Sequence, residues 1–223
     1  MSSFLEKPAG RLLADALFEV GAVAFGNFTL KLHEKQPNAP LSPYFFNLRT
    51  PDNPKPGPLT LAELRLIGSA FFLEFVLGRN LPHDVICGIP NAGEPLVLAL
   101  REQGLMPVLQ LLKTDDGDGR RISGIRPGHH IRSGARVLLL DDVVIEADTK
   151  IEAITVLRDA GFVVEHLLVV IDRQQGGVPL VAARGVRTHS LFTTTELIEY
   201  YHQSGRIDEA MHERATTYLA DPR

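Results

Sequence analysis

The stretch "VLLLDDVVIEADTK", residues 137–150, decides the fold class of this 223-residue chain. Four apolar residues run without a break into Asp141 and Asp142, and residues 149–161 then place apolar residues at helical spacing. A continuously apolar strand is typical of a parallel sheet that is covered on both faces, whereas a half-exposed strand alternates. The stretch therefore predicts one strand-and-helix unit of an α/β fold, with two carboxylates at the carboxyl end of the strand.

The same pattern of strands and helices continues on both sides of this unit. Further apolar strands are expected at residues 84–90, 106–113, 164–172 and 188–193, with a helix at 93–104. Upstream we expect a helix at 8–24, short strands at 27–32 and 44–48, and a helix at 60–78 after the proline-rich segment 51–58. Two helices are expected at 195–201 and 207–219. Ligands of such sheets bind beyond the carboxyl ends of the strands, so those ends are the candidate site.

Composition argues against several classes of function. The net charge of -4 does not suggest a general nucleic-acid binder. Cys87 is the single cysteine, which excludes an internal disulfide framework and a cysteine-based zinc site. An apolar run of about 18 residues, the length needed to cross a membrane, is absent from the sequence. We expect a cytoplasmic protein that binds neither nucleic acid nor membrane.

Two expected strand ends carry charges that suit a small polar ligand. Asp141 and Asp142 bring two negative charges together, which a cation or ribose hydroxyl groups would offset; helix capping and solvation are the alternative. Asp172 and Arg173 end the next strand, where an arginine can hold a carboxylate by two parallel hydrogen bonds. A surface Asp–Arg pair would leave the same pattern.

The stretch "TDDGDGRR", residues 114–121, predicts a mobile lid because it is rich in glycine and charge. It lacks the oxygen-ligand spacing and closing glutamate of a calcium loop. Lys113, Arg120 and Arg121 either bring positive charge to an anionic ligand or form a solvated face. His129 and His130 are expected to be exposed loop residues rather than metal ligands.

Four motifs together resemble one family. "FGNFTLKL…SPYFFNLR", "GIPNAGEPLVLAL", "RVLLLDDVV" and "VVIDRQQGG" occur in this order, and the chain from about Phe25 to Tyr201 resembles orotate phosphoribosyltransferases of the type I phosphoribosyltransferase fold. The resemblance implies a parallel five-stranded core sheet flanked by helices, in one domain. Its parts would be a small hood at approximately 25–50, a core at approximately 60–195 and C-terminal helices at 195–220.

The resemblance also implies a reaction and roles for particular residues. The family transfers phosphoribosyl from phosphoribosyl pyrophosphate to orotate, with Mg²⁺, and acts as a homodimer. The matching residues are Lys31 near the base and pyrophosphate, Phe45 and Phe46 against the orotate ring, Arg173 on the orotate carboxylate, and Asp141 and Asp142 on the ribose hydroxyls. The same two aspartates would approach Mg²⁺ through the ligand.

Two loops depart from the family pattern. The family phosphate loop runs close to D-D-V-I-T-[TA]-G-T-[SA], and the altered residues here are Ile145, Glu146, Ala147, Asp148 and Thr149. This removes two hydroxyls and the permissive glycine from a loop whose amides surround the 5′-phosphate. At ~4 Å each like-charge contact would cost about 1 kcal/mol in water and about 4 kcal/mol at intermediate effective dielectric.

The catalytic loop departs as well. The family pattern R-K-E-x-K-D-H-G-E-G-G aligns with residues 110–120, so that Asp116 stands where the histidine does and the basic positions are lost in this register. Lys113, Arg120 or Arg121 would have to supply the missing positive charge.

These departures leave three hypotheses. The chain is a divergent transferase, or a catalytically impaired member that binds a pyrimidine or nucleoside and regulates, or an enzyme whose ribosyl donor lacks the 5′-phosphate. We expect phosphoribosyl pyrophosphate to bind poorly. The directions of Glu146 and Asp148 discriminate: carboxylates that point into the site disfavour the donor, and carboxylates in solvent do not. A capping box from Thr149 to Glu152 would account for the altered loop without any ligand.

Overall fold

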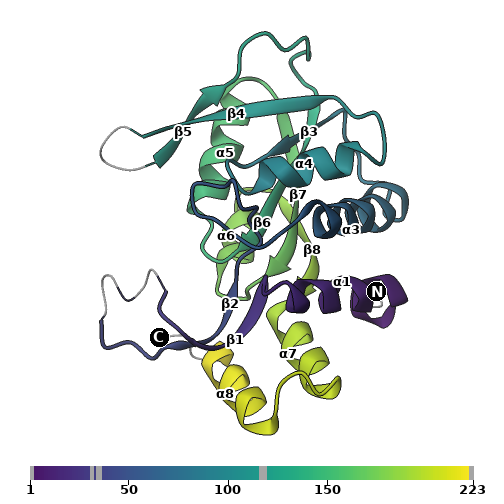
Figure 1. The fold of residues 1–223 in the computed structure, drawn as a ribbon. Helices are drawn as coiled ribbons and strands as arrows, with labels where there is room; N and C mark the ends of the chain where they lie inside the picture. Colours follow the sequence, from purple (N-terminus) through teal and green to yellow (C-terminus); the bar gives the residue numbers. More distant parts are fainter. Residues whose placement is uncertain (1–2, 31–32, 34–36, 116–119, 221–223) are drawn as a thin grey trace.

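The computed structural model describes residues 3–30, 33, 37–115 and 120–220. Within these residues the central sheet has the strand order β5-β4-β3-β6-β7-β8 (Figure 1). The strands are β3 (Val85–Gly88), β4 (Val108–Asp115), β5 (Arg120–Ile125), β6 (Arg136–Val144), β7 (Val163–Asp172) and β8 (Arg187–Thr193). Five of them, β4-β3-β6-β7-β8, are parallel to one another, as the sequence predicted.

The central strand β6 explains why its sequence is continuously apolar. Leu138 and Leu140 belong to the core on one face of the sheet, whereas Val137 and Leu139 belong to the core on the other face. Successive side chains of a strand point to opposite faces, so a strand with helices on both faces must be apolar at every position. The fold class predicted from residues 137–150 is therefore confirmed.

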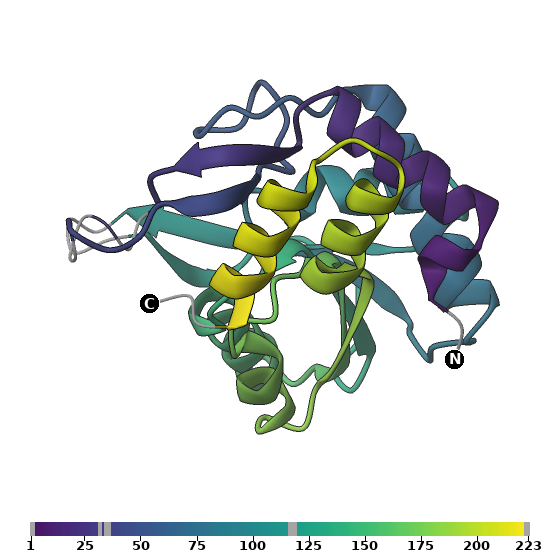
Figure 2. The same cartoon turned by 90° about the horizontal axis from the view of Figure 1, so that it is seen from below.

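Helices cover both faces of the sheet. Those after β3, β6 and β7 are α4 (Gly93–Arg101), α5 (Asp148–Asp159) and α6 (Gly177–Ala182). The others are α1 (Pro8–Glu19), α3 (Leu61–Phe71), α7 (Thr194–Gln203) and α8 (Glu209–Ala220), with short helical turns at Phe4–Glu6 and Phe72–Leu77. Figure 2 shows α1, α7 and α8 together on one side of the molecule. A capping box formed by Thr60 and Glu63 begins α3.

A separate pair of strands packs against these helices. β1 (Val23–Phe28) and β2 (Ser42–Phe46) are antiparallel, and Val23 pairs with Phe46. The first of them begins four residues earlier than the predicted strand at 27–32, because α1 ends at Glu19 and Gly21, with a φ of 76°, turns the chain directly into it. Tyr218 of α8 meets Tyr44 of β2 edge-on at 5.7 Å.

One strand was missed from the sequence. Residues 120–125 form β5, which pairs antiparallel with β4, whereas the sequence analysis assigned 114–121 to a lid loop. The strands β4 and β5 include residues 114, 115, 120 and 121 of the expected loop. An edge strand with polar and glycine residues does not show the apolar run on which the other strands were recognised. The described residues contain no helix with the length and apolar character that a membrane span requires.

Candidate active site

The carboxyl ends of β3, β6 and β7 meet at one edge of the sheet, as parallel neighbours must. The amide of Arg173, just after β7, donates to the carbonyl of Val144 at the end of β6 over 2.9 Å. On the other side of β6, the amide of Ile89 donates to the carbonyl of Leu140 over 2.9 Å. The structure therefore brings the two predicted charged ends, Asp141–Asp142 and Asp172–Arg173, to the same place.

Glycines let the turn after β3 lie directly against β6. A Cβ atom on Gly93 would come within 2.4 Å of the Leu140 carbonyl oxygen, and one on Gly88 within 2.5 Å of the Gly93 oxygen. Neither position has room for a side chain. The turn, which includes a cis peptide bond between Pro90 and Asn91, leads into the N-terminus of α4 beside the aspartates of β6.

Asp141 is paired with a buried lysine. The Lys150 ammonium, from the first turn of α5, lies 2.7 Å from Asp141 Oδ2 and donates to the Val143 carbonyl over 2.7 Å. Both side chains are buried. Burial alone would lower the pKa of Lys150, but the two adjacent aspartates outweigh it, so the pKa lies above its ordinary value. Lys150 is thus a charged partner inside the site.

Sequence reasoning missed this lysine, although a signal was present. Lys150 lay within the expected capping box from Thr149 to Glu152 and was given no role of its own. Its spacing to Ala153, Ile154 and Leu157, which are all buried, places it on the apolar face of α5. A lysine on such a face needs an internal partner, and the preceding strand offered a carboxylate.

Asp142 is half-buried, and its carboxylate is bound by a backbone amide and not by a lysine. Its Oδ1 accepts the Val143 amide over 2.7 Å, while its own amide donates to Asp141 Oδ1 over 2.9 Å. Burial, and next the negative charge of Asp141, raise the pKa of Asp142 to about 7; Lys150 and Arg49 act in the opposite direction. Among the described residues, no side-chain cation lies as close to Asp142 as Lys150 lies to Asp141, so Asp142 is the more available carboxylate of the two.

The altered loop turns its acids outward. Glu146 and Asp148 are exposed, while Ala147 is fully buried. Ala147 has a φ of -102°, a conformation open to any residue, so the turn does not need the glycine of the family pattern. Gly177 packs directly against this loop. A Cβ atom on Gly177 would lie 2.5 Å from the Ile145 carbonyl oxygen, so a side chain has no room there.

The predicted capping box at Thr149 is wrong. α5 begins at Asp148, so Thr149 is already inside the helix, and Ala147 at the N-cap position offers no side-chain hydrogen bond. The Thr149–Glu152 spacing matches the box, but the helix begins two residues too early for it. The first amides of a helix lack intrahelical partners, and here no cap residue takes them up.

Arg173 reaches the two-stranded sheet. Its side chain is buried, with the guanidinium 5.4 Å from the centre of the Tyr44 ring and Nη2 3.4 Å from Ser42 Oγ. Nε of Arg173 and the Tyr44 hydroxyl are buried and make no hydrogen bond within the described part of the chain. Buried donors of this kind are normally satisfied, so they favour a ligand at this point.

The two predicted phenylalanines face different neighbours. Phe46 stacks on Tyr44 with centroids 5.4 Å apart, on the side of Arg173. Phe45 stacks on Phe28 at 5.5 Å. Alternation along β2 puts Ser42, Tyr44 and Phe46 on one face, and the sequence analysis named only the last of these three.

The remaining predicted residues lie toward the β4–β5 hairpin. Lys113 Nζ donates to the Pro90 carbonyl over 3.1 Å, which places its charge at the turn after β3. Arg121 lies on β5 opposite Thr114, with an exposed side chain. The predictions for Lys31, Asp116 and the side chain of Arg120 fall outside the described residues. His129 and His130 are exposed, as expected.

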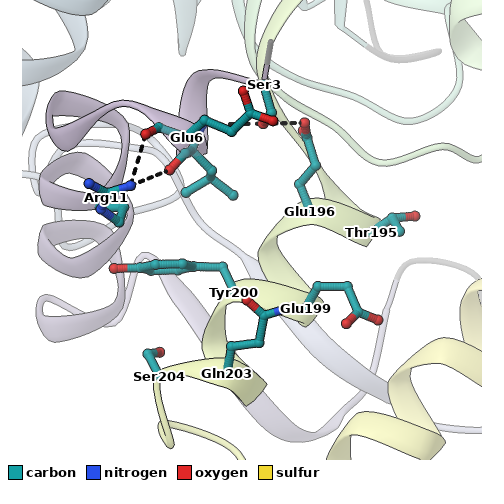
Figure 3. Close-up of a pocket in the computed structure, with 10 residues that line it drawn as sticks. Ser3, Glu6, Arg11, Thr195, Glu196, Glu199, Tyr200, Gln203 and Ser204 are labelled. Atoms are coloured by element: carbon teal, nitrogen blue, oxygen red, sulfur yellow. Dashed lines mark hydrogen bonds between the residues drawn. The ribbon is translucent and has the colours of Figure 1, made fainter.

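Two hollows adjoin this region. One of about 550 Å³ lies between residues 50–54 and α4, and Asn91 and Glu94 line it. Burial raises the pKa of Glu94, against the charges of Arg126 and Lys113. The other, of about 470 Å³, lies between the N-terminal segment and α7 and contains none of the predicted site residues (Figure 3).

Comparison with known proteins agrees with this geometry. No family model matches the chain. The orotate phosphoribosyltransferase of Cenarchaeum symbiosum is 31% identical over 194 residues, which cover 86% of this chain and 88% of that protein. Among solved structures, the UMP synthase of Leishmania donovani has a TM-score of 0.75 and 25% identity, over 96% of this chain and 42% of that one.

A second solved structure matches over its whole length. The orotate phosphoribosyltransferase of Aeropyrum pernix has a TM-score of 0.69 and 24% identity, over 88% of this chain and 99% of that one. This likeness shows the fold, and the archaeal relative at 31% identity shows the family. The chain has the type I phosphoribosyltransferase fold and belongs to the orotate phosphoribosyltransferase family.

Proposed function

We propose that this chain transfers the phosphoribosyl group of phosphoribosyl pyrophosphate to orotate, giving orotidine monophosphate and pyrophosphate in pyrimidine biosynthesis. The observation that carries the proposal is the position of Arg173. It is buried at the sheet edge next to β6, with an unbonded Nε among the described residues, against the aromatic face of β2. A base that carries a carboxylate suits this arrangement.

The base would be held by charge and by ring contacts. A guanidinium can bind a carboxylate by two parallel hydrogen bonds, which fixes the plane of the ligand as well as its position. Tyr44 and Phe46 are stacked beside Arg173 and provide an apolar wall. The Tyr44 hydroxyl is a further buried donor at this point. Orotate offers both the carboxylate and the flat ring that such a site selects.

The ribose would lie over the end of β6. Asp142 has a carboxylate oxygen besides the one that accepts the Val143 amide, and it can accept from a ribose hydroxyl. Negative charge here also stabilises the positive charge that develops on the ribose in an oxocarbenium-like transition state. Lys150 holds Asp141 in place and limits the repulsion between the two carboxylates.

The residues present fit a magnesium ion held mainly by the ligand. Asp142 is the candidate protein ligand, since Asp141 Oδ2 is already bonded to Lys150. Mg²⁺ commonly binds through one or two carboxylates and substrate phosphates. When bound, it would neutralise charge on the pyrophosphate. Lys113, with its ammonium at the Pro90 carbonyl, would add positive charge on the same side.

The 5′-phosphate would bind at the N-terminus of α5. The amides there are not taken up by a side-chain cap, and the helix end attracts anions. Glu146 and Asp148 are exposed, so their repulsion is nearer the ~1 kcal/mol of a contact in water than the ~4 kcal/mol of a partly buried one. This supports the ordinary donor with reduced affinity, and it weighs against a donor that lacks the phosphate.

The test is turnover. Orotate, phosphoribosyl pyrophosphate and Mg²⁺ are incubated with the protein and pyrophosphatase, and orotidine monophosphate is quantified by chromatography. The expected result is enzyme-dependent product, lost in the R173M variant and reduced in D142N. Orotate binding without any product, at millimolar donor and with a folded protein, would instead make the chain a binding module. We also propose a homodimer, which light scattering after gel filtration would test.

A further inference from the structure

A group of two histidines and a glutamate lies outside the site described above, where α7 meets α8. His202 lies in the last turn of α7, Glu209 begins α8, and His212 follows about one turn later. One ligand atom from each residue can be chosen such that all three lie within 4.8 Å of one another. Figure 2 shows α7 and α8 side by side, joined by a short connection. The three side chains therefore converge from two helices on one point.

The two oxygens of Glu209 face the two rings. Oε2 lies 3.0 Å from His202 Nε2, and Oε1 lies 3.9 Å from His212 Nδ1. In a tetrahedral zinc site with bonds of 2.0–2.1 Å, neighbouring ligand atoms are about 3.3–3.4 Å apart. The two distances lie on either side of this value, so the carboxylate lies near ligand spacing from both rings. Because the two rings are stacked, one of them must also turn before both lone pairs are directed at one ion.

A further carboxylate fixes the orientation of His212. Its Nε2 lies 2.8 Å from Glu199 Oε1, on α7. A carboxylate can only accept, so this bond places the ring proton on Nε2 and leaves the Nδ1 lone pair directed toward Glu209. By the same rule His202 Nε2 donates to Glu209 Oε2 in the metal-free protein, and this proton must leave when an ion binds. Metal-bound histidines typically donate their other N–H to such a carboxylate. Figure 3 shows the Glu199 carboxylate directed away from the Tyr200 ring and the N-terminal segment.

The imidazole rings of His202 and His212 stack on each other and are partly exposed to solvent. The two imidazoles are nearly parallel, with centroids 4.3 Å apart and an angle of 21° between their planes. Their side chains are 30% and 18% exposed for His202 and His212, so the point on which they converge remains open to solvent. An ion could enter, and water could complete its coordination.

We propose that His202, Glu209 and His212 form a binding site for a transition-metal dication, with Zn²⁺ as the best fit. Two imidazoles and one carboxylate suit zinc, whereas magnesium prefers oxygen ligands alone. Glu199 is a positioning residue that acts through His212. The site is separate from the proposed transferase chemistry and does not rest on it.

A bound ion would link the two C-terminal helices, α7 and α8. α8 carries Tyr218 against Tyr44, and Tyr44 lies beneath Arg173. An ion that fixes α8 to α7 therefore stabilises the packing behind β2. Alternatively, these residues only form histidine–carboxylate hydrogen bonds between the helices, and then the protein would have no preference for zinc over magnesium at this place.

The test uses the full chain after removal of metal with a chelator. Zn²⁺ is titrated by calorimetry, Co²⁺ by its visible absorption, and Mg²⁺ serves as the comparison. Calorimetry should show one equivalent of zinc bound per chain. The visible absorption bands of bound Co²⁺ should be those of a site with nitrogen and oxygen ligands. The melting temperature should rise by about 5–10 °C at a zinc concentration of one hundred times Kd. Mg²⁺ should give neither signal.

Variants separate this site from others. H202Q/H212Q should remove the equivalent, and E199Q should weaken binding about 10–100-fold. H129Q/H130Q changes two exposed histidines elsewhere and should leave the titration unaltered. Each variant is checked for folding by circular dichroism in chelator. Absence of saturable binding up to about 1 mM Zn²⁺, or binding unchanged in folded H202Q/H212Q, would overturn the proposal. If H202Q/H212Q does not fold, the stoichiometry in wild type and E199Q decides.

Discussion

Replacing Lys150 with methionine should reveal how strongly the buried pair holds the end of β6. The ammonium bonds both Asp141 Oδ2 and the Val143 carbonyl at 2.7 Å, and the exposed fractions of the Lys150 and Asp141 side chains are 10% and 6%. Methionine keeps the length of the stem but removes the charge and its donors. Asp141 would then be a buried carboxylate without its cation, and Val143 would lose a hydrogen bond.

The expected loss of stability in K150M follows from the cost of leaving one charge of a buried ion pair without its partner. Two unit charges 2.7 Å apart at an effective dielectric of 20 attract by about 6 kcal/mol, and desolvation offsets part of this. Removal of one partner of such a pair typically costs about 3–5 kcal/mol. For a chain of this size that corresponds to a fall in melting temperature of about 6–20 °C. D141N alone should cost a similar amount, because it leaves the ammonium unpaired.

The double variant K150M/D141N completes the cycle. It leaves no buried charge of this pair, so it should be more stable than K150M, with a coupling energy of at least about 2 kcal/mol. Urea unfolding followed by far-ultraviolet circular dichroism measures all four proteins. Exposed Lys55 gives the matched control K55M, which should change stability by less than about 0.5 kcal/mol. A loss below about 1 kcal/mol in K150M, or additive single changes, would refute the reasoning.

Three further predictions concern the phosphate loop, the base site and the core. The double variant E146A/D148A should raise affinity for phosphoribosyl pyrophosphate about 5–30-fold in calorimetry at low salt, with a smaller gain at high salt, because two exposed carboxylates then cease to repel a dianion; equal affinities at low salt would contradict this. R173M should weaken orotate binding at least about 30-fold and leave inorganic phosphate binding unchanged, since it removes a charge-assisted pair; equal loss for both ligands would indicate a structural role instead. The pKa of His189 is lowered to about 4 by burial, and next by the charges of His166 and Arg79, so its contribution to stability is complete above pH 6.5 and is lost as pH falls toward 4. Wild type should therefore lose about 3 kcal/mol more than H189Q across that window in urea midpoints, and parallel pH profiles would show that His189 is not responsible.

The sequence predicts those strands that must be apolar at every position because both of their faces are buried. β6 had to be apolar at every position because Leu138 and Leu139 face different cores, and that requirement is visible in the letters. β5 has no such requirement. It lies at the edge of the sheet, paired only with β4, and its pattern of arginine, serine and glycine resembles a loop. Only the pairing with β4 shows that these residues form a strand and not a loop. That pairing depends on both segments, so it cannot be predicted from residues 120–125 alone.

The base side was predicted from resemblance, and the structure shows what local reasoning left out. Tyr44 directly precedes the two phenylalanines that were named, yet it is the residue whose ring lies against Arg173. The alternation of β2 puts Tyr44 and Phe46 on the same face, whereas Phe45 is on the other with Phe28. Once β2 was predicted as a strand, this face could have been derived. The contact with Arg173 could not, because it joins segments about 130 residues apart, as the Ser42–Arg173 bond shows.

The charges around β6 and α5 show why the altered loop is compatible with an anionic ligand. From the sequence alone, Glu146 and Asp148 are two carboxylates placed where a phosphate binds, and the replacement cations considered were Lys113, Arg120 and Arg121 but not Lys150. In the structure both acids lie in solvent, where repulsion is weak, while Lys150 carries its charge inside, against Asp141. The internal carboxylates are thus partly neutralised. Asp148 is the first residue of α5, but its side chain is exposed, and the N-cap position is Ala147, which offers no side-chain hydrogen bond. The types of the charged residues alone predicted poor binding of the donor, whereas their positions, which depend on the faces of α5, weaken the expected repulsion.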